Sequence, residues 1–161
     1  MLGNPGLAST GELLCNSLGA WISAFSLHMG IISKNIAELE AIFQGLILAW
    51  NLGFKFIHLE IDFMIVLSWL TNDKDISLDV IPLLCDCRNL MECDWTVQVY
   101  HIFREANGCA DALAKRGNQQ QCILETYETC PAFVCATFVW DMEHLGTTRM
   151  CLVKAVMLAV V

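Results

Sequence analysis

The stretch NIAELEAIFQGLILAWNLGFKFIHLEID, residues 35–62, decides the fold class of this chain. Its first part carries apolar residues at spacings of three and four, which is the pattern of a helix with one buried face. These residues are Ile36, Leu39, Ile42, Phe43, Leu46, Ile47 and Trp50. Gly53 stands where the helix should end, because glycine adopts a left-handed backbone without steric cost. After Gly53 the side chains alternate between two faces, so the stretch predicts a helix followed by a strand.

The segments on either side extend this pattern. Residues 11–29, GELLCNSLGAWISAFSLHM, predict two strands joined by a tight turn. Residues 63–72 and 78–93 predict two helices, the second interrupted near its start by Pro82. Residues 95–103 alternate as a further strand. Helices therefore follow strands along most of the chain, as they do in α/β proteins.

The last part of the pattern is weaker. Residues 109–117 predict a short helix, with Asn107 as its N-cap and Gly117 as its stop. Beyond about residue 118 the periodicity fades, although residues 131–142 could add a helix or a strand. The whole order predicts an α/β fold in which helices cover a mixed sheet.

Composition narrows the class of protein. The 161 residues suit one domain, and 56% apolar residues exclude a disordered chain. The net charge of −8 has the wrong sign for a protein that binds mainly through phosphate contacts. An acidic balance does suit a site that gathers carboxylates around divalent cations.

Compartment and membrane association follow from the cysteines and the chain ends. There are nine cysteines without a CxxC motif, and residues 1–10 lack the features of a signal peptide. We therefore expect reduced thiols in a nuclear or cytoplasmic protein. Residues 151–161 are apolar but shorter than the about 20 residues of a spanning helix. We interpret them as a packed or frayed end or a reading-frame artefact, and expect no membrane partner.

Three carboxylates fall at positions where α/β folds gather ligand sites. Glu38 is expected in the first turn of the long helix, Asp62 at a strand end, and Asp111 in the first turn of the last helix. An acid in a first turn is also favoured by the helix dipole, so Glu38 and Asp111 have a structural alternative. Asp62 ends an apolar strand, where the helix dipole does not explain an acid. Glu60 lies on the same face of that strand and could either interact with the groups around Asp62 or form a surface ion pair. His101 is either a polar loop residue or a proton carrier.

Two segments together carry a family resemblance. AELEAIFQGLILAWNLGFKFIHLEIDFMIVLSWL, residues 37–70, and VYHIFREANGCADALAK, residues 99–115, resemble the ribonuclease H-like domain. The likeness is to the plant branch found alone or behind reverse transcriptases in retroelements, and it covers roughly residues 3–117. The resemblance implies a ribonuclease H-like domain at residues 1–120 and a C-terminal extension at residues 121–161.

The resemblance also implies a site and an activity. In that family four acidic residues hold two Mg²⁺ ions, or Mn²⁺, that cut the RNA strand of an RNA–DNA hybrid. Glu38, Asp62 and Asp111 match three of these metal ligands, and His101 matches a loop histidine that helps to move protons or release product. Carboxylates suit this chemistry because Mg²⁺ prefers oxygen ligands, and paired ions activate the attacking water and stabilise the leaving oxygen.

The chain departs from the family pattern at two places. The family's first aspartate lies on an opening strand ahead of the GNPG turn, but this chain begins at Met1 with that turn following at once. We therefore expect a mixed sheet whose first strand is missing, with a buried gap and an impaired metal pair, and a truncated gene model as the explanation. Phe63 stands where the family usually has a small serine.

Alternative functions remain open at this point. Arg104, Lys115 and Arg116 could meet a phosphate backbone, although Lys115 and Arg116 also suit a helix C-terminus. The expected function is RNA–DNA hybrid endonuclease activity of ribonuclease H type. The alternatives are a catalytically inactive nucleic-acid-binding module and a retroelement fragment without a stable fold. The sequence does not predict an oligomeric state.

Overall fold

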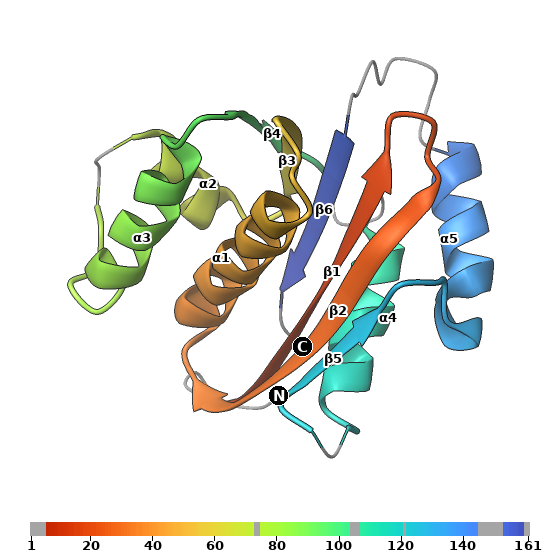
Figure 1. Ribbon diagram of the computed structural model, residues 1–161. Coiled ribbons are helices and arrows are strands. Elements are labelled where there is room, and N and C mark those ends of the chain that lie inside the picture. The colour runs from red at the N-terminus through yellow and green to blue at the C-terminus, as the bar shows by residue number, and fades with distance from the viewer. Residues whose placement is uncertain (1–5, 73–74, 104–106, 121, 145–152, 160–161) are drawn as a thin grey trace.

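A six-stranded mixed sheet with the order β4-β3-β6-β1-β2-β5 forms the centre of the computed structural model (Figure 1). The structure describes residues 6–72, 75–103, 107–120, 122–144 and 153–159. The strands are β1 Gly6–Asn16, β2 Trp21–Ile32, β3 Phe56–Ile61, β4 Thr96–His101, β5 Leu124–Tyr127 and β6 Val153–Ala159. The helices are α1 Lys34–Asn51, α2 Met64–Thr71, α3 Ile81–Met91, α4 Gly108–Gly117 and α5 Ala132–His144. None of these helices is long and apolar enough, over the described residues, to cross a membrane.

The predicted hairpin is confirmed, and its turn is held by one side chain. β1 and β2 pair as antiparallel strands. The Oδ1 atom of Asn16 accepts hydrogen bonds from the backbone N–H groups of Leu18 and Ala20, at 3.0 and 2.9 Å. Gly19 has a φ of +76°, which glycine adopts without strain. The local sequence therefore specifies this turn.

The long helix is confirmed, with one correction to its start. The hydroxyl of Ser33 accepts a hydrogen bond from the N–H of Ile36 and caps α1, which begins at Lys34. Glu38 is the fifth residue of α1, so its expected place in the first turn is wrong. Gly53 follows the helix with a φ of +81°, as predicted.

Two further helices differ from the sequence pattern. Pro82 lies in the first turn of α3 rather than interrupting it, because the missing N–H of proline would be unpaired there anyway. Residues 131–142, for which the pattern was undecided, fall within or next to the helix α5. In both cases the local sequence allowed the helix but did not specify its boundary.

The two faces of the sheet are covered by different helices, and the alternation along β1 shows which is which. Gly11 contacts Leu113 of α4, where any side chain at position 11 would overlap it. Leu13 packs into the same cluster as Leu113. Leu14 instead joins the core beneath α1, α2 and α3. Figure 1 shows α4 and α5 on the side of the sheet opposite to α1.

The C-terminal residues of the chain form the central strand of the sheet. β6 pairs with β1 in the antiparallel sense and with β3 in the parallel sense. Val156 is paired with Leu13 on one side and with Glu60 on the other. Of the alternatives for the apolar C-terminal segment, the packed end agrees with the structure, whereas the expected gap in the sheet is wrong because β6 fills it. An apolar run of this kind is typical of a strand buried on both faces, and local pattern alone does not reveal which slot it fills.

Glu12 is a carboxyl group inside the core. Its side chain is only 3% exposed, and its Oε1 atom has no hydrogen-bond partner among the described residues. α1 makes room for it, because a side chain at Gly45 would overlap the Glu12 carboxyl group. Burial raises the pKa of Glu12 well above its usual range, because the apolar surroundings disfavour the charged carboxylate.

We predict that Glu12→Gln removes a pH-dependent loss of stability. Below the usual carboxyl range Glu12 is protonated in both states, so its contribution to stability is intact. As the pH rises, the unfolded state ionises first, and the contribution is lost until the folded pKa is reached. The stability of the variant relative to the native protein should grow by about 1 kcal/mol per pH unit over this window. Urea unfolding from pH 4.5 to pH 8 measures this, and a difference independent of pH contradicts it.

We predict that Val156→Pro unfolds the sheet. Both neighbours of Val156 are strands, so a proline there removes a ladder hydrogen bond and leaves a buried carbonyl without its donor. The expected loss of stability is at least about 2 kcal/mol. Val156→Thr keeps the N–H and the branched Cβ and serves as the control. Equal denaturation midpoints for the two variants would show that β6 does not lie inside the sheet.

Candidate functional site

The carboxyl ends of three strands meet at one edge of the sheet. β3 and β4 are parallel, and the pairings through β6 and β1 give β2 the same direction. α1 begins directly after β2, Asp62 follows β3, and His101 is the last residue of β4. We call this the carboxyl edge. Ligand sites in α/β sheets form at such edges. Glu38, Asp62 and His101, three of the predicted site residues, belong to elements that meet here.

Asp62 and His101 are neighbours along this edge. His101 is paired in register with Ile61, the residue before Asp62. The N–H of Ile102 donates to the carbonyl of Ile61 at 3.0 Å, which continues the pairing past the end of the strands. The imidazole of His101 is exposed and lies 5.7 Å from the ring of Phe103. Asp62 is partly buried, and both side chains can therefore be reached from solvent.

Glu38 enters the edge from α1. Its side chain is 5% exposed. One turn earlier on the same helix, the Nζ atom of Lys34 lies 4.3 Å from the centre of the Phe63 ring. Because Phe63 directly follows Asp62, this contact joins the start of α1 to the end of β3.

Asp111 belongs to α4. It is in the first turn of α4, as predicted, and its Oδ2 atom is 2.5 Å from the Nζ of Lys115. Its side chain is 27% exposed. α4 covers the face of the sheet opposite to the face that α1 covers, so the sheet lies between the helices that carry Glu38 and Asp111.

The start of α4 is held by a residue that the sequence reasoning missed. Asn107 is the residue before α4, but its side chain makes no capping hydrogen bond. Instead the Oδ2 atom of Asp141, on α5, accepts from the N–H of Cys109 at 2.9 Å. Asp141 is 4% exposed, and Gly108 allows α5 to approach. The signal in the sequence was an acid that directly follows the apolar run of residues 132–140, and an acid buried there needs a hydrogen-bond partner.

The basic residues expected to meet phosphates are already engaged or undescribed. Lys115 is bonded to Asp111, and the Nε atom of Arg116 lies 3.2 Å from Oε2 of Glu125. Arg104 lies outside the described residues. A phosphate backbone would therefore have to compete with two existing ion pairs.

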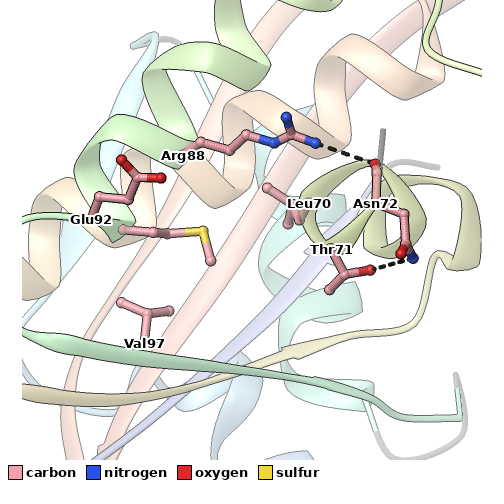
Figure 2. Close-up of a pocket in the computed structure, with 7 residues that line it drawn as sticks. Leu70, Thr71, Asn72, Arg88, Glu92 and Val97 are labelled. Atoms are coloured by element: carbon pink, nitrogen blue, oxygen red, sulfur yellow. Dashed lines mark hydrogen bonds between the residues drawn. The ribbon is translucent and has the colours of Figure 1, made fainter. Parts of the chain in front are cut away.

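A separate cavity of about 370 Å³ lies between α2, α3 and β4 (Figure 2). It opens near Val97 at the start of β4, whereas His101 is at the end of that strand. It is lined by two charged residues, Arg88 and Glu92. Arg88 donates to the carbonyls of Asn72 and Trp69, and so caps the C-terminus of α2. This cavity is a structural feature away from the carboxyl edge.

The predicted ligands have the right chemistry for a hard cation but are not gathered around one. Among the described residues, no three histidine, cysteine, aspartate or glutamate side chains are grouped so as to hold a metal ion. Glu38 and Asp111 come from helices on opposite faces, and β6, which lies between β1 and β3, has the sequence VKAVMLA without a carboxylate. In this arrangement the residues do not fit a metal pair, and their assignment as ligands stays a prediction.

Comparisons with known proteins place the chain in a family. The model of the reverse transcriptase-like family matches residues 1–117. A protein of Arabidopsis thaliana, named provisionally as a ribonuclease H protein, is 33% identical over 91% of this chain. Ribonuclease HI of Halobacterium salinarum is 32% identical over 70% of this chain. The chain spans 23% and 57% of the lengths of these two relatives.

Solved structures agree. RNase H1 of Halobacterium salinarum superposes with a TM-score of 0.69 and 29% identity, over 74% of this chain and 91% of that one. The N-terminal RNase H domain of a Mycobacterium tuberculosis protein shares the fold, with a TM-score of 0.52 and 16% identity over 70% and 91% of the two chains. With the matched family model and the mixed sheet described above, the chain belongs to the reverse transcriptase-like family and folds as a ribonuclease H-like domain.

Proposed function

We propose that this chain recognises RNA–DNA hybrids as a ribonuclease H-type domain and hydrolyses the RNA strand only weakly. The observation that carries the proposal is the juxtaposition of Asp62 and His101 at the carboxyl edge, beside a central strand without a carboxylate. The named activity of the relatives supports the substrate class. The composition of β6 supports the reduced hydrolysis.

The chain's own residues have the following roles in this proposal. Asp62 and Glu38 supply negative charge at the edge, and Asp111 supplies it from α4. His101, at the end of β4, is placed to exchange a proton with solvent or with a bound substrate. A divalent ion bound at the edge would supply charge for the transition state, but the described arrangement does not gather the ligands for it.

Binding alone is a second candidate function. It is favoured by the same central strand, because β6, between β1 and β3, supplies no carboxylate for a metal ion, whereas the strand ends of the carboxyl edge are all present. Binding should also be modest, since Lys115 and Arg116 must leave their carboxylate partners to reach a phosphate. Affinity carried by few phosphate contacts falls with added salt, and fluorescence anisotropy over a salt series measures that dependence.

The variant Asp111→Asn separates the two functions. If the domain hydrolyses the hybrid, we expect a rate at least about 100-fold below that of the Halobacterium enzyme, since even indirect disturbance of a metal site costs 10–100-fold. Asp111→Asn should abolish the remaining cleavage in Mg²⁺ or Mn²⁺ and leave hybrid binding equal or tighter, because it releases Lys115. Gel analysis of cleavage and anisotropy of a labelled hybrid measure the two effects.

A matched control is Asp94→Asn, which removes another exposed acid bonded to a lysine, Lys55. If the Asp111→Asn variant cleaves the hybrid as well as the Asp94→Asn variant does, Asp111 has no catalytic role. Binding without any cleavage in the native chain would favour the second function. Absence of a cooperative thermal transition would instead support a fragment without a stable fold.

A carboxylate introduced into β6 tests the reason given for weak hydrolysis. Val156 is in register with Glu60, so Leu158, two residues on, is level with Asp62 and is paired with Gly11 of β1. We predict that Leu158→Asp raises hydrolysis at least about tenfold over Leu158→Asn, which has a similar shape without the charge. If both variants remain folded by circular dichroism and cleave alike, the composition of β6 is not what limits the activity.

A further inference from the structure

Lys34 is an unusual residue for the position it occupies. It is the first residue of α1, and the first turn of that helix contains no acid. The N-terminus of a helix carries partial positive charge, so a cation there is unfavourable. A lysine at this position calls for a compensating interaction elsewhere.

Phe63 provides one such interaction. The ammonium of Lys34 lies over the Phe63 ring, 4.3 Å from its centre, and a cation is attracted to the face of an aromatic ring. The Phe63 ring packs against the core cluster beneath α1, α2 and α3, so it is held in place. The ammonium is therefore directed toward the residue that follows Asp62 rather than into open solvent.

The same ammonium lies on the helix face that carries Glu38. Lys34 and Glu38 are four residues apart on α1, which places their side chains next to each other one turn apart. Glu38 is 5% exposed, and a buried carboxylate is costly without a positive charge nearby. On the other face of the sheet, Asp111 has its own lysine, Lys115, at 2.5 Å.

We propose that Lys34, positioned by Phe63, is an internal cation that neutralises the carboxyl edge in place of a divalent ion. The proposal rests on the proposed function in so far as that function treats Glu38 and Asp62 as the acids of the edge. It accounts for two facts together: a lysine at an unfavourable helix position and a phenylalanine beside Asp62. It makes Lys34 a residue that sets the affinity of the edge for metal ions.

The test is Mn²⁺ binding to the full chain, measured by isothermal titration calorimetry and by the electron paramagnetic resonance signal of free Mn²⁺. We expect Lys34→Met to bind Mn²⁺ about tenfold more tightly than the native chain, because a competing charge is removed. Phe63→Leu, which keeps the lysine but removes the ring, should give a smaller increase. A thermal transition measured for each variant shows whether it is folded. If Lys34→Met does not fold, Phe63→Leu still tests the proposal.

Lys55→Met is the matched control. Lys55 also lies near an aromatic ring, that of Trp50 at 5.4 Å, and bonds to an acid, Asp94, at 2.9 Å. It precedes β3, at the end of the strand away from Asp62. Removing it changes the net charge of the chain equally, so its Mn²⁺ affinity should stay near that of the native chain.

The outcomes are distinguishable from failure of the proposed function. Equal Mn²⁺ affinity for Lys34→Met and Lys55→Met overturns the internal-cation role. Loss of hybrid binding in Lys34→Met without tighter Mn²⁺ binding also overturns it, and makes Lys34 a phosphate contact. Tighter Mn²⁺ binding by Lys34→Met supports the internal-cation role whether or not the chain binds a hybrid. Absence of hybrid binding in metal-free anisotropy would overturn only the proposed function.

Discussion

The backbone pairing of β6 is the interaction on which the rest of this structure depends. In the strand order, β4 and β3 lie on one side of β6 and β1, β2 and β5 on the other. Every peptide group of a central strand requires partners on both sides, because an unpaired group in the interior loses its hydrogen bonds to water without replacement. The last strand of the chain thus joins the two halves of the sheet into one surface.

This choice of central strand also shapes the chemistry of the edge. The slot between β1 and β3 lies beside Asp62, and a strand in that slot could contribute a side chain to any site formed there. The sequence of β6, VKAVMLA, contributes backbone pairing but no carboxylate. The extension proposed at residues 121–161 accordingly supplies two strands of the sheet, β5 and β6, and the helix whose Asp141 holds the start of α4.

Electrostatics at the site are balanced within the chain. The molecule carries a net charge of −8, yet the acids singled out by the family pattern lie beside lysines: Asp111 bonds to Lys115, and Lys34 sits one turn before Glu38. The buried Glu12 differs from these acids, because burial raises its pKa and so favours its neutral form.

Much of this could be predicted from the sequence, because it depends on neighbours along the chain. The spacing of apolar residues predicted α1, and Gly53 predicted where it ends. The turn NSLGA predicted the hairpin of β1 and β2. The same local rules predicted Asp62 at a strand end and Asp111 in a first helical turn. The position of Glu38 in the second turn of α1 was not predicted, because it depends on Ser33 being the residue that caps the helix.

Tertiary structure decided the features that depend on residues far apart in the chain. An apolar segment specifies that it will be buried but not between which strands, so the central place of β6 came from the vacant pairing groups of β1 and β3. Asp141 caps a helix 32 residues earlier, and Lys34 meets Phe63 across two elements. The sequence by itself determined the elements and the acids at their ends. Packing determined which strand ends and helix starts meet, because only folding sets the distance between residues that are far apart in the chain.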